Sequence, residues 1–84
     1  MFNKVKAVKP LADYVLSVTF ENGQIKEYDI KPLFGKYRQF SALRDIKGLY
    51  GLVRVDMGGY GISWNDELDI SCNELYNNGV APIS

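Results

Sequence analysis

Two runs of alternating apolar and polar residues flank Asn22-Gly23, and this pattern constrains the fold more than any other stretch. An Asn-Gly pair between such runs is a strong signal for a β-hairpin. We therefore expect two antiparallel strands between Tyr14 and Ile30. The rest of the chain should pack around them.

The register of this hairpin follows from the side chains that it must bury. A two-residue loop would place acidic side chains beside Leu16 on the apolar face. A three-residue loop at residues 21–23, with Gly23 left-handed in a G1 bulge, instead sets Leu16 opposite Tyr28. The sequence favours the bulged loop. The predicted buried face contains Tyr14, Leu16, Val18, Phe20, Tyr28 and Ile30, and the other face contains Ser17, Thr19, Ile25, Glu27 and Asp29.

The composition predicts one small globular domain. Hydrophobic residues make up 46% of the 84 residues and aromatic residues 13%, which argues against disorder. We expect a single domain over residues 1–84, with a frayed tail at residues 79–84. No apolar stretch is long enough for a membrane span or a signal peptide, and Cys72 is the one cysteine. These features predict a cytoplasmic protein without a disulfide and without a membrane partner.

Further strands are predicted on both sides of the chain's middle. Apolar residues alternate with lysines up to Pro10, so residues 1–30 should form a three-stranded antiparallel meander. Val53 with Val55 and Ile62 with Trp64 alternate with polar residues and predict a second hairpin.

The middle of the chain carries weaker helical signals. Pro32 is expected to begin a short helical turn that Gly35 breaks. Phe40, Leu43 and Ile46 recur at three-residue spacing and predict a short amphipathic helix.

The last helix has a clearer start. Ser71 and Glu74 form a capping box, so a helix of about two turns should begin there and end at Gly79. The predicted fold class is therefore α+β: an antiparallel sheet of about five strands, made of the meander and a second hairpin, with two or three short helices.

The residue types limit the possible chemistry. The chain has no histidine, which excludes Ser-His-Asp and Cys-His catalytic arrangements. Asp66, Glu67 and Asp69 could bind a cation and support a metal-assisted reaction, but their spacing is not that of an EF-hand loop, and a solvated loop is favoured. We therefore expect that this protein is not an enzyme and that it has no catalytic residue, no metal and no cofactor.

Charge is unevenly distributed although the net charge is zero. Residues 31–54 contain six basic residues and one acidic residue, whereas residues 55–84 contain five acidic residues and no basic one. The two segments could attract each other within the fold, or the basic one could face a partner. Aromatic residues interleave with these bases, as in nucleic-acid binders, so a nucleic-acid contact stays an alternative. The candidate basic surface comprises Lys36, Arg38, Arg44 and Lys47.

Five motifs follow one another along the chain. They are L-x-V-x-F-x-N-G-x-x-x-x-Y-D-I-x-P-L (Leu16 to Leu33), F-x-x-L-x-D (Phe40 to Asp45), V-x-V-D (Val53 to Asp56), I-x-W (Ile62 to Trp64) and D-I-x-x-x-x-L-Y (Asp69 to Tyr76). In this order they resemble the small bacterial family called domain of unknown function 2442. The resemblance implies a small α+β domain without an established activity. Some relatives carry a helix-turn-helix domain after this module, and many are encoded beside another small protein, as in toxin and antitoxin pairs.

The motifs also supply the candidate binding residues, which are Tyr28, Asp29, Trp64, Asp69 and Tyr76. Trp64 and Tyr76 either belong to the core or line a small pocket between the sheet and the last helix. The leading hypothesis is a non-enzymatic interaction or regulatory module, in one form antitoxin-like, that contacts a partner protein or a second copy through a sheet face or edge. The alternative is a sensor of small ligands or nucleic acid.

Overall fold

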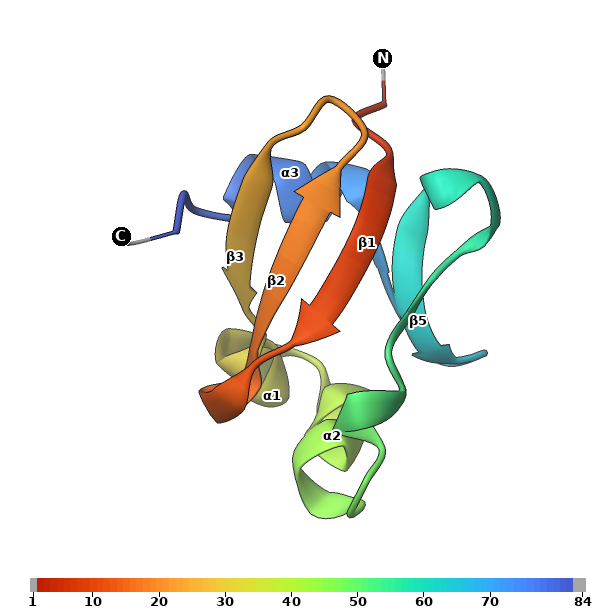
Figure 1. The fold of residues 1–84 in the computed structure, drawn as a ribbon. Helices are drawn as coiled ribbons and strands as arrows, with labels where there is room; N and C mark the ends of the chain where they lie inside the picture. Colours follow the sequence, from red (N-terminus) through yellow and green to blue (C-terminus); the bar gives the residue numbers. More distant parts are fainter. Residues whose placement is uncertain (1, 83–84) are drawn as a thin grey trace.

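The computed structural model describes residues 2–82, which form two three-stranded antiparallel sheets (Figure 1). The first sheet has the order β1-β2-β3, with strands Val5–Pro10, Val15–Phe20 and Ile25–Asp29. The second has the order β4-β5-β6, with strands Arg54–Val55, Gly61–Asn65 and Leu68–Ser71. The described part of the chain also has three α-helices: α1 (Lys31–Lys36), α2 (Ala42–Asp45) and α3 (Cys72–Asn78).

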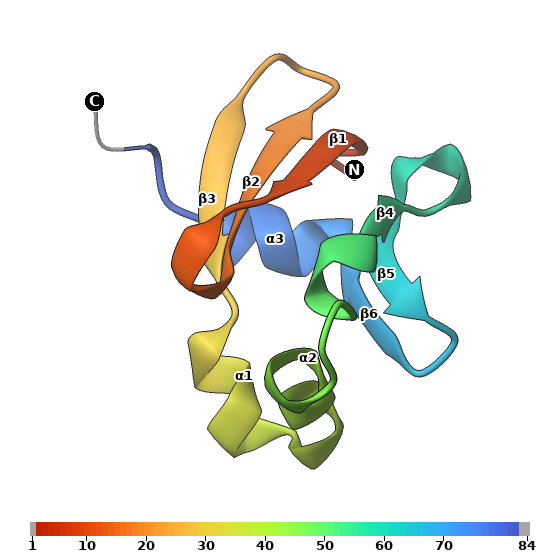
Figure 2. The same ribbon diagram turned by 60° about the horizontal axis from the view of Figure 1, so that its bottom comes forward.

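The helices separate into two groups. Figure 2 shows α3 between the two sheets, whereas α1 and α2 lie together at one end of the molecule. Residues 2–82 also contain four 3₁₀ turns: η1 (Ala12–Tyr14), η2 (Arg38–Ser41), η3 (Tyr50–Leu52) and η4 (Met57–Gly59). No helix within residues 2–82 is long and apolar enough to cross a membrane.

The predicted α+β class is confirmed, but the single sheet of about five strands is wrong. The six strands divide into two sheets, and β1 runs beside β4 and β5 without joining their ladder. The additional strand is β6, where Leu68 and Ile70 are buried and Asp69 is exposed. Asn65 accepts hydrogen bonds from the N–H groups of Glu67 and Leu68 and so closes the tight turn that pairs β6 with β5.

The predicted register of the first hairpin is confirmed. Leu16 pairs with Tyr28, and the Phe20 N–H bonds the carbonyl of Gln24, which leaves the three-residue loop 21–23. Gly23 has a φ of +92°, the left-handed conformation that the bulged loop requires. Of the predicted apolar face, all but Tyr14 are buried; Tyr14 is half-buried in the turn before β2. Ile25 is exposed on the other face. Burial of the apolar side chains therefore selects the register.

The core lies between the first sheet, α3 and β5. Leu16, Phe20 and Ile62 are fully buried there, as is Leu75 of α3. Each such side chain stabilises the fold by roughly 1.5–3 kcal/mol. The Ser71 half of the predicted capping box is present, because the Ser71 hydroxyl accepts the Glu74 N–H at 3.2 Å. The Glu74 carboxylate accepts the Tyr28 hydroxyl and has no described bond to the Ser71 N–H.

Three local expectations about the middle of the chain need correction. Gly35 does not break α1, which continues to Lys36. The predicted amphipathic helix is split into η2 and α2, with Phe40 and Leu43 buried as expected. Ile46 is 56% exposed because the backbone leaves the helix at this residue.

The tail is more ordered than expected at its start. Val80 forms an antiparallel bridge with Glu27, with N···O distances of 2.7 and 2.9 Å. Gly79, which follows α3, makes this return possible because a Cβ atom there would lie 2.5 Å from the Leu75 carbonyl oxygen. Residues 83–84 of the predicted frayed tail lie outside the described residues.

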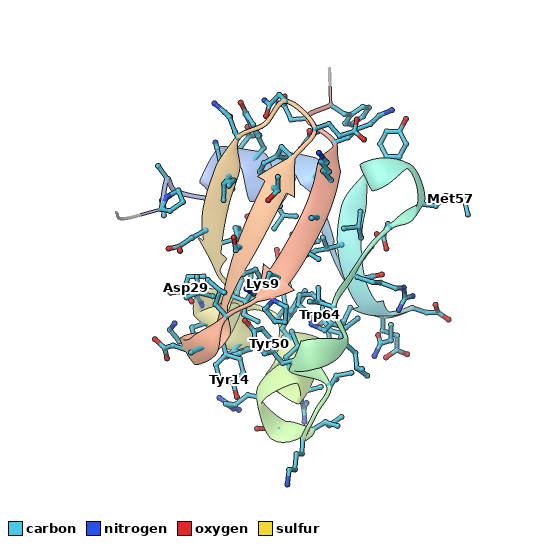
Figure 3. All side chains as sticks on the ribbon, in the orientation of Figure 1. Lys9, Tyr14, Asp29, Tyr50, Met57 and Trp64 are labelled. Carbon is cyan, nitrogen blue, oxygen red and sulfur yellow. The ribbon has the colours of Figure 1, made fainter. Side chains whose placement is uncertain are left out.

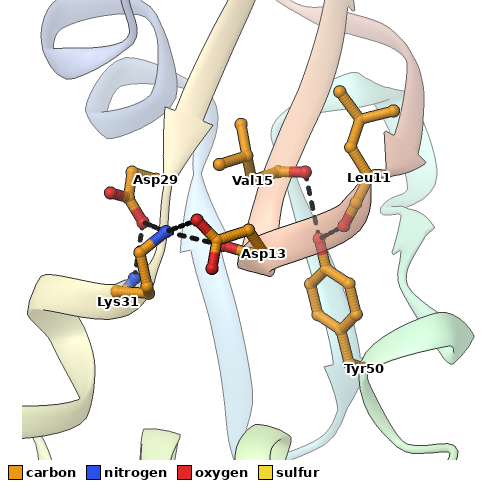
Figure 4. Close-up of polar contacts among 6 residues, drawn as sticks. All are labelled: Leu11, Asp13, Val15, Asp29, Lys31 and Tyr50. Carbon is orange, nitrogen blue, oxygen red and sulfur yellow. Dashed lines mark hydrogen bonds and ion pairs between the residues drawn. The ribbon is translucent and has the colours of Figure 1, made fainter.

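The turn between β1 and β2 has an unusual backbone. Asp13 and Tyr14 have φ values of +62° and +57°, a conformation that side-chain-bearing residues rarely adopt. The Tyr50 hydroxyl lies 2.8 Å from the Leu11 carbonyl and 3.0 Å from the Val15 carbonyl, one on each side of this turn (Figure 4). The tertiary contacts therefore hold a turn that local preference disfavours.

Candidate functional site

A groove opens between α1 and η2 on one side and β6 on the other. It encloses about 330 Å³, and we name it the α1–β6 groove. The segment of α1 and η2 contributes Leu33, Lys36, Tyr37, Gln39 and Phe40. Tyr28 comes from β3, and the C-terminal part of the chain contributes Glu67, Asp69, Ile70, Ser71 and Glu74.

Tyr28 and Glu74 connect the first sheet to α3 inside this groove. The Tyr28 hydroxyl donates a hydrogen bond to Glu74 Oε2 at 2.7 Å. Burial, together with the hydrogen bond to Glu74 and the charge of its carboxylate, raises the pKa of Tyr28, so the phenol stays protonated at neutral pH. The pair is a fixed hydrogen-bonded link between two elements.

The groove has an excess of negative charge. Its charged residue types are three acids, Glu67, Asp69 and Glu74, and one base, Lys36. None of the ion pairs described for residues 2–82 involves a residue of this groove. A bound cationic group would therefore meet carboxylates that form no described ion pair within the protein.

One wall of the groove is a free strand edge. The Cys72 N–H donates a hydrogen bond to the Tyr60 carbonyl, and Ile62 pairs with Ile70 two residues further along the ladder. Tyr60 with Cys72 and Ile62 with Ile70 are therefore the hydrogen-bonded pairs between β5 and β6. Because hydrogen-bonded and non-hydrogen-bonded pairs alternate in an antiparallel ladder, the N–H and C=O of Asp69 point away from β5. The described hydrogen bonds give these two groups no partner.

A second cleft, of about 420 Å³, adjoins the groove along β3. Asp29 borders this cleft, but its carboxylate accepts the Lys31 N–H at 2.9 Å and pairs with Lys31 Nζ at 3.0 Å (Figure 4). Partial burial raises the pKa of Asp29, but the hydrogen bonds and charge of Lys31 outweigh it, and the net shift is downward. Asp29 thus fastens the start of α1.

Two of the three aromatic candidates, Trp64 and Tyr76, have structural contacts and do not line the groove. Trp64 is 3% exposed, and its Nε1–H donates to the backbone carbonyl of Tyr50 at 2.9 Å; both residues are labelled in Figure 3. The Tyr76 ring packs edge-on against Phe20 at 5.0 Å, and Lys26 Nζ lies 3.9 Å from its centroid. Both aromatic residues join elements of the core.

The four residues of the candidate basic surface have different surroundings. Lys36 lines the α1–β6 groove, whereas Arg44 and Lys47 line a separate cleft beside the β1–β2 turn. Arg44 pairs with Asp45 at 3.0 Å, and Arg38 is exposed on η2. The structure thus places three of these bases beside two different hollows, and Arg38 lines neither of them.

Comparison with models of known families decides the family. Residues 5–81 match the family described as "Protein of unknown function (DUF2442)". The chain belongs to this family. The comparisons found no match among curated proteins and none among solved structures.

The DUF2442 match contains every residue of the α1–β6 groove, yet only some were predicted from the sequence. Tyr28, Asp69 and Lys36 were candidates and do line the groove. Glu74 was recognised as a capping residue, while its link to Tyr28 had no local signal. Within residues 2–82, no group of three or more His, Cys, Asp or Glu side chains lies close enough together to hold a metal ion. The acidic residues of the Asp66–Asp69 turn therefore do not form such a group.

Proposed function

We propose that this member of the DUF2442 family is a non-enzymatic interaction module that holds a segment of a partner protein in the α1–β6 groove. The observation that carries the proposal is the free edge of β6, which forms one wall of the groove and presents the N–H and C=O of Asp69. Proteins commonly bind extended segments by adding a strand to such an edge.

The chemistry of the groove supports binding over catalysis. Tyr28 is held protonated and donates a hydrogen bond to the Glu74 carboxylate. This pair therefore offers neither a phenolate nucleophile nor a carboxylate that is free to act as a general base. The apolar surface of Leu33 and Phe40 suits contact with a side chain.

An antitoxin-like role is one form of this proposal. In that form, the segment held in the groove belongs to a toxin, and binding would keep that partner inactive. The acidic groove would repel a phosphate backbone, so nucleic acid is the less favoured ligand of this site.

Co-purification from the native host tests the proposal. Gln39 lines the groove and is exposed, so Gln39→Trp should obstruct the groove without disturbing the core. Gln24→Trp is the matched control, because Gln24 is exposed directly after the β2–β3 loop and does not line the groove. A companion protein should be recovered with the wild-type chain and with Gln24→Trp and lost with Gln39→Trp.

Two outcomes would count against the module. One is a companion recovered equally with Gln39→Trp, which would place the contact elsewhere. The other is no companion above background, or only nucleic acid that nuclease removes, which would favour the sensor hypothesis.

A further inference from the structure

We infer that the partner segment is an extended, lysine- or arginine-rich strand that pairs its backbone with β6 and sets its basic side chains against the carboxylates of the groove. This inference rests on the proposed function and names the chemistry of the partner. Three features of the groove carry it: the backbone groups at its edge, its charge and its apolar wall.

The backbone groups of β6 favour a strand over a helix. Ser71 does not pair with β5 through its own N–H, because Ser71 and Gly61 form a non-hydrogen-bonded pair in the ladder. Its N–H therefore points to the same side as the N–H and C=O of Asp69. These groups lie along the groove at the two-residue spacing with which an added strand presents its own backbone. A helix satisfies its backbone groups internally and would leave them unpaired.

The charge of the groove selects a basic strand. Glu67, Asp69 and Glu74 face one base, Lys36, and the adjoining cleft adds Glu27. None of these carboxylates has a described ion pair. An acidic segment would bring like charges together, whereas lysine or arginine side chains supply the missing counter-charges and contribute to specificity.

The opposite wall adds an apolar contact. Leu33 is half-buried, Phe40 and Ile70 are buried, and all three line the groove. Successive side chains of a strand point to opposite sides, so an alternating segment can set apolar residues on this wall and basic residues toward solvent and the acidic rim. The preferred partner segment therefore alternates basic and aliphatic residues.

Short synthetic peptides provide the probe. The first is a capped hexapeptide that alternates lysine and valine, and the second replaces each lysine with glutamate. Binding is measured by fluorescence anisotropy at low salt. The lysine peptide should bind at least about tenfold more tightly than the glutamate peptide, and its affinity should fall as salt is added. Equal binding of the two peptides would overturn the charge argument.

N-methylation of the peptide tests strand addition separately. Alternate amides of a strand point to opposite edges, so methylation of one alternate set should abolish binding while methylation of the other set leaves it unchanged. Equal effects of the two sets would overturn strand pairing, whatever the role of charge.

Variants of the protein connect the peptide result to the proposed function. Glu67→Lys/Asp69→Lys should weaken the lysine peptide at least about tenfold, and Glu21→Lys/Asp66→Lys, exposed outside the groove, is the control with the same change in net charge. If a companion protein is lost with Gln39→Trp but is retained by Glu67→Lys/Asp69→Lys, the groove function stands and the basic-strand inference is overturned. A companion that ignores Gln39→Trp would overturn both.

Discussion

Replacement of Tyr50 by phenylalanine removes the hydroxyl that brackets the strained β1–β2 turn and leaves the ring in place. That hydroxyl lies 2.8 Å from the Leu11 carbonyl and 3.0 Å from the Val15 carbonyl. The Val15 carbonyl keeps the Leu11 N–H as a partner at 2.8 Å, so it is not left unpaired when the hydroxyl is removed. Each net hydrogen bond that the hydroxyl makes contributes about 0.5–1.5 kcal/mol.

Tyr50→Phe should therefore lower the free energy of unfolding by about 1–2 kcal/mol. In a domain of this size, each 1 kcal/mol corresponds to a fall of about 4–8 °C in Tm. Urea and thermal unfolding followed by far-UV circular dichroism measure both quantities. Burial also raises the pKa of Tyr50, and only weaker interactions oppose this shift, so the comparison should be made at neutral pH, where the phenol is protonated.

The matched control is Tyr37→Phe, which removes a hydroxyl from a ring that is 43% exposed and has no described hydrogen bond. It should change the free energy of unfolding by less than about 0.5 kcal/mol. If Tyr50→Phe were no more destabilising than Tyr37→Phe, the hydroxyl would not hold the turn, and the reasoning would be refuted.

Three further predictions concern other elements. Gly23→Ala places a Cβ in open space but at a φ of +92°, so urea unfolding should show that the free energy of unfolding falls by about 1–2 kcal/mol. Gly23→Asn should lower it less, because asparagine tolerates this conformation better. Equal losses for the two variants would contradict a backbone cause. Ser71→Ala removes the cap of α3 and should cost about 1 kcal/mol, whereas Ser71→Asp should retain most of the stability in the same assay. Burial and Glu74 raise the pKa of Tyr28 in the folded protein, so the unfolded phenol ionises first. The stabilisation that this shift gives the fold is therefore complete below a pH of about 10 and is lost as the pH rises through the higher pKa of the folded state. Tyr28→Phe should make the alkaline decline in unfolding free energy shallower, and an unchanged slope would argue against this linkage.

The hairpin and the cap of α3 could be predicted because their determinants are neighbours in the sequence. Leu16 and Tyr28 lie on one face only if the loop has three residues, and Gly23 supplies the conformation that this loop needs. Ser71 and Glu74 are likewise three residues apart. In each case, the apolar pattern and the turn residue favour the same structure.

The division into two sheets could not be predicted in this way. The alternation of Leu68, Asp69 and Ile70 is a strand signal, but it is too short to decide between a strand and a loop. No local sequence pattern predicts whether β1 joins β4 in one hydrogen-bonded sheet or only packs beside it. That choice depends on contacts between residues far apart in the chain.

The groove shows the same limit for the candidate site. Tyr28, Lys36 and Asp69 were singled out separately, and only the packed fold brings them to one hollow with Glu74. Trp64 matched a family motif as well as they did, yet its contacts place it in the core. A motif position alone does not distinguish a packing residue from one that lines a cleft.

The sequence by itself determined the α+β class, the bulged hairpin with its buried face, and the capped last helix. These features follow from periodicity and turn chemistry, which act over a few residues. The tertiary structure alone decided that the strands form two sheets, that α3 lies between them, and that the β6 edge faces α1 across an acidic groove. Such features arise when separate apolar faces are buried together, because the lowest free energy of that packing depends on the whole chain at once.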